Sequence, residues 1–367
     1  MTSIKDIKTL SEIMLADAAL ADDCVQILLP EVSICVRSNS SELLDVLRHY
    51  FRHIVHTGKT ADDLTIIDVT AIECPVISPD LPFKHWSREA GKCSKKDAYF
   101  DFYNGRCIHK VRTGMLFLQS FPYRIAAGPC LANSNQVINF INNQYINFLQ
   151  QQGWLICHAA ALSDQQQSIA IAGFSGGGKS TTMLHLMSDE RFDYISNDRL
   201  FIRANGDQVE LRGIPKLPRV NPGTLLNNPQ LKKILPPEKT ERLAAMPTAE
   251  LWDLEDKYDV DISDVYGSSR FSDNPKLAHF FILNWSHATT EKTSIRKVHP
   301  EQQPELMDAI MKSSGPFYQY PDGSFYHDHT PLDRSLYIQL LKKINVYEVS
   351  GHADFDCVTN FCLQELC

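Results

Sequence analysis

Residues 173–180 read Gly-Phe-Ser-Gly-Gly-Gly-Lys-Ser, and they constrain the fold more than any other stretch of the chain. They match the pattern G-x-x-x-x-G-K-[ST], the phosphate-binding P-loop. Glycines let the backbone turn so that successive N–H groups face phosphate oxygens. The lysine reaches the outer phosphates, and the hydroxyl that follows it can bind Mg²⁺. The motif therefore predicts a nucleotide site made by Gly173, Ser175, Gly176, Gly177, Gly178, Lys179, Ser180 and Thr181.

The flanks of the motif have the secondary structure that a P-loop requires. Ser168–Ala172 is a short apolar run between a Gln-rich turn and Gly173, which predicts a buried strand. After the loop, Met183, Leu184 and Met187 recur at helical spacing. Strand, glycine-rich loop and helix is the expected context, and the helix N-terminus adds its own preference for anions.

Composition narrows the class of protein. A chain of 367 residues favours two domains, and its 43% hydrophobic and 22% charged content is ordinary for a globular protein. No apolar run approaches the roughly 20 residues that span a bilayer, and the first residues do not resemble a signal peptide. We therefore expect a cytoplasmic protein without a membrane partner. The net charge of -8 argues against nucleic acid as a partner.

The pattern along the chain predicts an N-terminal α+β domain over residues 1–150 and a nucleotide-binding domain over 151–367. Asn104-Gly105 predicts a hairpin with a type I′ turn. The helix expected at 133–151 is rich in Asn and Gln, and it could belong to either domain. Other helices are expected at 41–53, 180–187, 338–343 and 357–366, and strands at 25–36 (around Pro30), 64–71, 168–172, 193–197, 200–202, 209–211, 277–285 and 345–349.

A phosphotransferase needs a carboxylate beside its P-loop, either for Mg²⁺ or for the proton of the attacking hydroxyl. Asp198 follows a predicted strand soon after the P-loop helix and fits this role, although a turn aspartate is the alternative. His158 lies beside a short apolar segment, where either a structural histidine or a group near the phosphates is expected. Glu210 and Arg212 share one face of a strand, as site residues or as a simple ion pair.

Several strings of residues together resemble a known family. The core of the chain resembles HPr kinase/phosphorylases over about residues 154–223, and it looks closest to the HPr-kinase-related kinase B group, from about residue 100 onward. The core resemblance rests on His158-Ala-Ala, Gly173–Ser180, Ser196-Asn-Asp-Arg199 and Glu210-Leu-Arg-Gly213, and the closer one on Arg112-Thr-Gly, Asn139-Phe-Ile-Asn, Ser196-Asn-Asp-Arg199 and Pro215–Gly223.

The resemblance implies an α/β fold with a P-loop kinase core of the HPr kinase / phosphoenolpyruvate carboxykinase type. It also implies ATP and Mg²⁺ as cofactors and transfer of a phosphoryl group to a serine on a protein. Carried over by position, Asp198, Lys179 and His158 would be catalytic, and Ser180, Glu210 and Asp198 would bind the metal. Relatives of this kind often form homo-oligomers.

The chain departs from the family pattern at three places. The first of two adjacent family aspartates is Asn197 here, and Thr181 stands where an acid is usual. Arg270 is a weak counterpart of the family's loop that captures the protein substrate, so HPr itself is not assumed as the acceptor. A protein serine kinase is the leading hypothesis. A small-molecule kinase and a non-catalytic, ATP-sensing binding module are the alternatives.

Overall fold

The computed structural model describes residues 4–55, 63–87, 96–174, 176–247, 250–251, 254, 256–286 and 288–366. Its internal contacts divide the chain into two units. The first contains the chain up to Gln152 together with Ser313–Pro331, and the second contains Gly153–Lys312 and the chain from Leu332 onward. The division predicted at residue 150 had placed Ser313–Pro331 with the second unit. The assignment of nucleotide binding to the second part stays a prediction.

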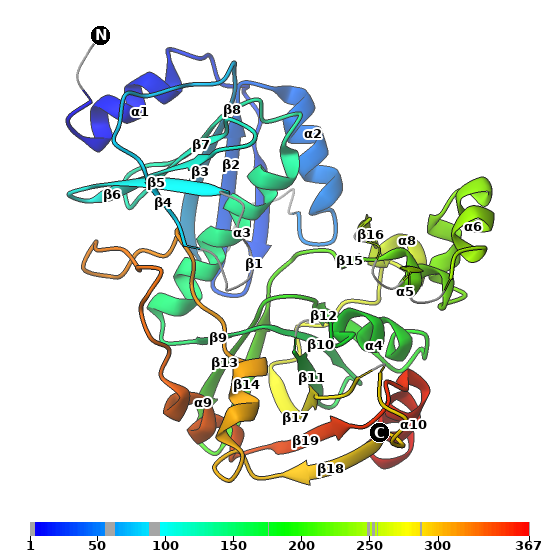
Figure 1. Cartoon of the computed structure of the whole chain (residues 1–367). Coiled ribbons are helices and arrows are strands. Elements are labelled where there is room, and N and C mark those ends of the chain that lie inside the picture. Colours follow the sequence, from blue (N-terminus) through cyan, green and yellow to red (C-terminus); the bar gives the residue numbers. More distant parts are fainter. Residues whose placement is uncertain are drawn as a thin grey trace. The chain divides into compact units, whose positions relative to one another are not determined.

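In the first unit, eight described strands form one sheet in the order β1-β2-β3-β8-β7-β6-β5-β4 (Figure 1). The pairs β2–β3 and β3–β8 are parallel, and all the other neighbours are antiparallel. The strands are β1 (Val25–Leu29), β2 (Val32–Ser38), β3 (Thr65–Glu73), β4 (Lys84–His85), β5 (Asp97–Phe102), β6 (Gly105–Lys110), β7 (Leu116–Ser120) and β8 (Arg124–Gly128), and the helices are α1 (Ile7–Leu15), α2 (Ser41–Tyr50) and α3 (Ser134–Gln151).

The alternation of strand β7 explains how helices cover both faces of this sheet. Side chains of successive strand residues point to opposite faces. Leu116 and Leu118 belong to the same buried cluster as Leu10 of α1. Phe117, between them, lies against Phe140 of α3, with ring centroids 5.0 Å apart. Helix α1 therefore covers one face and α3 the other.

Buried polar side chains hold the distant segment 313–331 in the first unit. Arg106 is fully buried and donates to the carbonyls of Pro316 and Tyr326 at 3.0 and 2.9 Å. Asn147 of α3 donates to the carbonyl of Phe317 at 2.9 Å. The amide-rich side of α3 therefore has a partial explanation: some of its amide side chains donate hydrogen bonds to buried backbone carbonyls.

Two turns in the first unit differ from the sequence expectation. Strands β5 and β6 form the predicted hairpin, but Gly105 is the first residue of β6 and Tyr103-Asn104 make the turn. Neither turn residue has a positive φ, so the predicted type I′ turn is wrong. The expected strand around Pro30 is a hairpin of two strands, with Glu31 at a φ of 68° in its turn.

In the second unit, nine described strands form a sheet whose main path is β12-β10-β11-β17-β14-β13-β9, and β19 pairs with both β17 and β18. β11, β17 and β19 are parallel. The strands are β9 (Leu155–Cys157), β10 (Ala159–Ser163), β11 (Ser168–Gly173), β12 (Asp193–Ser196), β13 (Leu200–Asn205), β14 (Gln208–Gly213), β17 (Lys276–Leu283), β18 (Ser294–Val298) and β19 (Asn345–Ser350), with β15 (Arg219–Val220) and β16 (Tyr258–Asp259) as a separate pair.

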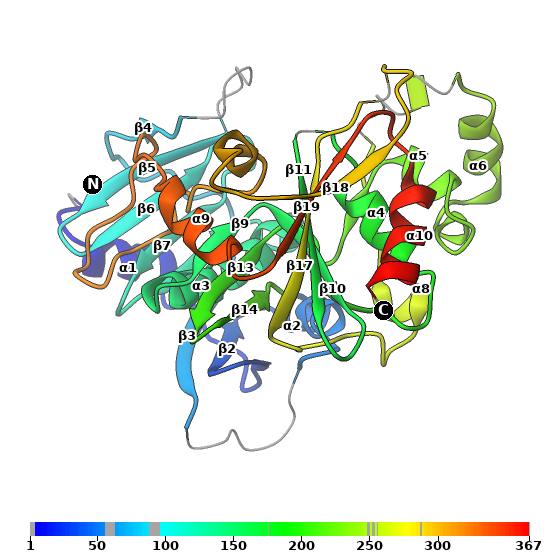
Figure 2. The same ribbon diagram turned by 90° about the horizontal axis from the view of Figure 1, so that it is seen from below.

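The helices of the second unit lie on both faces of its sheet. Ile169 and Ile171 of β11 pack in the cluster that contains α4 and α10, whereas Ala170 and Ala172 pack in the cluster that contains α9. Figure 2 shows α9 and α10 at the two ends of β19. The helices are α4 (Lys179–Leu186), α5 (Pro222–Leu226), η1 (Leu231–Ile234), α6 (Pro237–Ala244), α8 (Ile262–Tyr266), η2 (Pro304–Ala309), α9 (Arg334–Leu341) and α10 (Phe355–Glu365). Within the described ranges, no helix of either unit is long and apolar enough to cross a bilayer.

Candidate functional site

The P-loop connects β11 to α4, as its flanks predict. β11 ends at Gly173, which pairs with Leu283 at the end of the parallel strand β17. A Cβ on Gly173 would lie 2.9 Å from the Cβ of Leu283, so the two strands approach closely only because residue 173 is glycine. The loop therefore lies at the carboxyl end of two parallel strands, where ligands bind in open α/β sheets.

The shape of the loop depends on glycine and on two aromatic residues. Gly176 and Gly178 both have a φ of 78°, which disfavours other residues. The indole N–H of Trp285 donates to the carbonyl of Gly177 at 2.9 Å, and Phe355 packs on Gly178 and on Trp285. These contacts fix the loop from the side of β17 and α10. Ser175, also predicted to bind nucleotide, lies outside the described residues.

Helix α4 begins with the three polar residues of the motif. The Lys179 ammonium donates to the carbonyl of Gly173 at 3.2 Å, so it folds back over its own loop. Ser180 is partly exposed at the start of the helix. Thr181 is buried and shares a 2.8 Å hydrogen bond with the hydroxyl of Thr224 in α5. Lys179 and Ser180 are thus accessible to a ligand, whereas the Thr181 hydroxyl joins two helices.

His158 and Asp198 come together beside this loop. Strand β10 runs antiparallel to β11 with Ala159 opposite Ala172, which places His158 next to the end of β11. Asp198 follows β12, the neighbour of β10 on its other side. The imidazole Nε2 lies 3.3 Å from the Asp198 Oδ1, and the guanidinium of Arg199 donates to Oδ2 at 2.8 Å. Both carboxylate oxygens therefore have a partner.

The surroundings of Asp198 keep its carboxylate ionised. Burial alone would raise its pKa, but the hydrogen bond from His158 and the charges of Arg199 and Lys216 outweigh burial and lower the pKa well below its usual value. The pKa of His158 is also lowered. Its hydrogen bond with Asp198 favours the proton, while burial and the charges of Lys179 and Arg199 oppose it more strongly. The pair therefore consists of a carboxylate and a neutral imidazole near neutral pH.

Positive charge accumulates around Lys179. Burial lowers its pKa, and the charges of Lys312, Arg199 and Lys257 lower it further, against the attraction of Asp198. These cations, together with the Asp198 carboxylate, thus act on a partly buried ammonium. An anion bound at the loop would relieve this repulsion, which is the electrostatic setting of a phosphate site.

Asn197 stands where the family pattern has an aspartate. It is 8% exposed, and within the described ranges its side-chain Oδ1 has no hydrogen-bond partner. The preceding Ser196 holds the segment, since its hydroxyl donates to the carbonyl of Arg199 at 2.6 Å and accepts from the N–H of Ile214 at 3.2 Å. A buried acceptor without a partner is costly and fits a donor or cation that arrives with a ligand.

The structure does not bring Glu210 to the P-loop. Its carboxylate accepts from Asn205 at 2.6 Å and lies 3.5 Å from the guanidinium of Arg203, both near the turn of the β13–β14 hairpin. β14 approaches Asp198 only at its last residue, Gly213, which pairs with the first residue of β13. Glu210 lies three residues, or about 10 Å, away from that end. The predicted metal-binding role of Glu210 therefore does not fit the strand register.

The structure also shows what three arginines of this unit contact. Arg212 lies over the ring of Trp154 at 5.5 Å. Arg219, in the Pro215–Gly223 segment that carries part of the resemblance, pairs with Asp259 at 2.8 Å. Arg270 pairs with Asp193 and donates to nearby carbonyls, so its contacts are those of a structural residue.

Sequence reasoning missed several residues that the structure places at the loop. Trp285 and Phe355 lie more than a hundred residues after the motif, and no local pattern marks them. Lys257 and Lys312, whose charges act on Lys179, are isolated lysines in segments without a motif. Arg199 was within reach of prediction, because it follows Asp198 directly.

Comparisons with known proteins assign no family to the chain. No family model matches it, and no curated protein matches it. Among solved structures, the HPr(Ser) kinase/phosphatase from Coxiella burnetii matches with a probability of 1.00 and 10% sequence identity. That match covers 57% of this chain and 97% of the other, with a TM-score of 0.28. At that TM-score the likeness is too distant to specify the fold or the function.

Proposed function

We propose that the chain is an ATP- and Mg²⁺-dependent phosphotransferase that moves the γ-phosphoryl group of ATP to a hydroxyl. The proposal rests on one observation, which is that Lys179 and the His158–Asp198 pair lie near each other at the carboxyl end of β11. A P-loop alone holds phosphate, whereas a P-loop beside an ionised carboxylate has the parts for transfer.

Binding of the triphosphate relies on the loop and on its cations. The Lys179 ammonium would exchange the Gly173 carbonyl for the outer phosphates and offset charge on the transferring group. The Ser180 hydroxyl and Asp198 would hold Mg²⁺, which supplies charge neutralisation across the phosphate oxygens. These oxygen donors, with the buried Asn197 Oδ1 beside them, suit a cation that takes few protein ligands and completes its shell with phosphates and water.

Transfer needs a place for the acceptor's proton. The acceptor oxygen forms a bond to the γ-phosphorus while the bond to the β–γ bridging oxygen breaks, and ADP leaves. The hydroxyl proton passes to Asp198. Because the pKa of this carboxyl is low, the proton moves late, when bond formation has made the hydroxyl more acidic. His158 holds the carboxylate in position through Oδ1.

The acceptor is proposed to be a serine on a protein, as the family resemblance implies. A small-molecule acceptor uses the same chemistry and is the second candidate. Asn197 favours the third candidate, an ATP-sensing module without turnover, because an amide replaces one of the two carboxylates in the family pattern.

Labelled ATP distinguishes the three candidates. Purified protein is incubated with γ-labelled ATP, Mg²⁺ and lysate of the source cell, and label is counted separately in protein and in small molecules. Label in protein supports the leading proposal, and label only in small molecules supports the second. The matched variants are Lys179→Ala and Lys232→Ala, an exposed lysine of η1 in the same unit. Absence of transfer by the wild type, or undiminished transfer by Lys179→Ala, contradicts the kinase proposal.

A further inference from the structure

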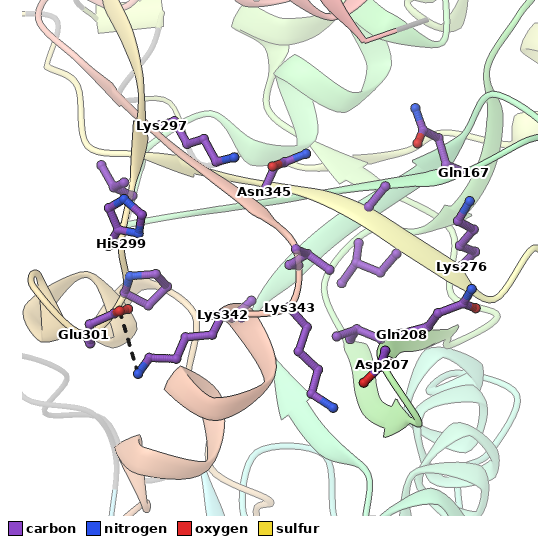
Figure 3. Close-up of a pocket in the computed structure, with 17 residues that line it drawn as sticks. Gln167, Asp207, Gln208, Lys276, Lys297, His299, Glu301, Lys342, Lys343 and Asn345 are labelled. Carbon is purple, nitrogen blue, oxygen red and sulfur yellow. Dashed lines mark ion pairs between the residues drawn. The ribbon is translucent and has the colours of Figure 1, made fainter.

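A hollow of about 690 Å³ lies at the end of the second unit's sheet that is opposite the P-loop (Figure 3). It is lined by the first residues of β17 and β19, by the end of β18 and by residues after α9. β17 runs from Lys276 at this hollow to Leu283 beside the P-loop, a separation of about 23 Å at the usual rise of a strand. The hollow is therefore separate from the P-loop site.

Apolar side chains lie beneath the hollow and present little surface to it. Val209, Leu277, Val298 and Leu341 line it and are buried. Small-molecule sites typically have volumes of about 300–1,000 Å³ and a mainly apolar lining with a few polar groups that orient the ligand. The size of this hollow falls within that description, whereas most of the residues that line it are polar or charged.

The rim carries four lysines, two of which have a structural explanation. Lys342 pairs with Glu301 at 3.7 Å, and Lys343 donates to the carbonyl of Gly206 at 2.6 Å. Both follow the last residue of α9, where positive charge stabilises the carbonyl end of a helix.

The other two lysines, Lys276 and Lys297, have no such explanation. Neither ammonium has a carboxylate partner within the described ranges, although Asp207 also lines the hollow. They come from different strands, and Figure 3 shows them on either side of Asn345. An exposed lysine is commonly solvated, but two lysines without an ion pair at one hollow create a positive potential in a chain whose net charge is -8.

We propose that this hollow binds a small organic anion, either a carboxylate or a phosphate ester. The negative groups of the anion lie between Lys276 and Lys297. The carboxamides of Asn345 and Gln208, which also line the hollow, can bond the remaining polar atoms. The assignment does not depend on phosphoryl transfer at the P-loop.

Three probes of one shape test the assignment by calorimetry: naphthyl phosphate, naphthoate and neutral naphthol. All proteins carry Lys179→Ala, so that binding at the P-loop does not contribute. We expect saturable binding of at least one anion and much weaker binding of naphthol. The phosphate and carboxylate arms show which head group the site prefers.

The variants separate this hollow from the rest of the surface. Lys276→Ala/Lys297→Ala is expected to weaken binding of the preferred anion by about 10- to 30-fold, from about fivefold for each charge removed. Lys232→Ala/Lys233→Ala, in exposed positions of η1, removes the same charge elsewhere and is expected to leave binding unchanged. Absence of saturable binding, equal binding of naphthol, or equal losses in the two double variants would overturn the proposal. Each outcome is independent of the labelled-ATP experiment.

Discussion

Replacing Gly178 by alanine tests the shape of the P-loop. Gly178 has a φ of 78°, and a Cβ there would lie 2.7 Å from the Cε1 of Phe355. The left-handed conformation costs a non-glycine residue about 1–2 kcal/mol. The Phe355 ring cannot move away freely, because it packs against Trp285 and His185 with centroid distances of 5.1 and 5.6 Å. Overpacking adds about 1–3 kcal/mol, so the total loss of folding free energy is about 2–5 kcal/mol.

The loop contains its own control. Gly176 has the same φ of 78°, but a Cβ there would meet nothing within 4 Å. Gly176→Ala should therefore cost only the backbone strain, about 1–2 kcal/mol. Thermal unfolding should show a Tm several degrees lower for Gly178→Ala than for Gly176→Ala, since each kcal/mol shifts Tm by about 2–4 °C in a domain of this size.

A double variant identifies the source of the difference. Adding Phe355→Leu to Gly178→Ala should restore part of the stability, whereas adding it to Gly176→Ala should not. Calorimetric titration with a non-hydrolysable ATP analogue should follow the same order, because a displaced loop misdirects its N–H groups. Equal losses in the two glycine variants, or no recovery with leucine at 355, would refute the close packing of Phe355 on the loop.

Three further predictions concern single groups. Trp285→Phe removes the bond to the Gly177 carbonyl and should weaken binding of the ATP analogue by about 0.5–1.5 kcal/mol in calorimetry. The pKa of His158 is lower in the folded protein than in the unfolded chain, so its contribution to stability is present above about pH 6.5 and is lost as the pH falls toward the folded value. His158→Gln should therefore flatten the rise of Tm as the pH increases toward about 6.5, and an unchanged slope would contradict the shift. Arg106→Met leaves Asp101 and two carbonyls without their buried partner, so it should cost about 3 kcal/mol and expose residues 313–331 to limited proteolysis.

Local patterns predicted most elements of this fold. Helix α2 begins where Ser40 caps it, and the Ser40 hydroxyl accepts from the N–H of Leu43. The strand, loop and helix around Gly173 and Lys179 are where the motif placed them. Such features depend on neighbours a few residues away, which a sequence displays directly.

Features set by distant contacts could not be predicted in the same way. Residues 313–331 join the first unit through Arg106 and Asn147, and no sequence pattern in that segment indicates those contacts. Glu210 lies in a correctly predicted strand, but the register of β13 with β14 places it near the hairpin turn. The sequence predicted a turn at Asn104-Gly105. The pairing of β5 with β6 places the turn one residue earlier, so Gly105 belongs to the strand.

We expect ATP binding to depend on Lys179 and phosphoryl transfer to depend on Asp198. The most direct measurement compares, for wild type, Lys179→Ala and Asp198→Asn, the affinity for a non-hydrolysable ATP analogue and the rate of label transfer from γ-labelled ATP. Lys179→Ala should lose both, because it removes the cation that binds the phosphates. Asp198→Asn loses one of the proposed Mg²⁺ ligands, but Lys179, Ser180 and the loop N–H groups remain, so it should bind the analogue within a few fold of wild type. It should transfer at least about 100-fold more slowly, since the proton acceptor is gone. Transfer by Asp198→Asn at the wild-type rate would contradict the assigned role of this carboxylate.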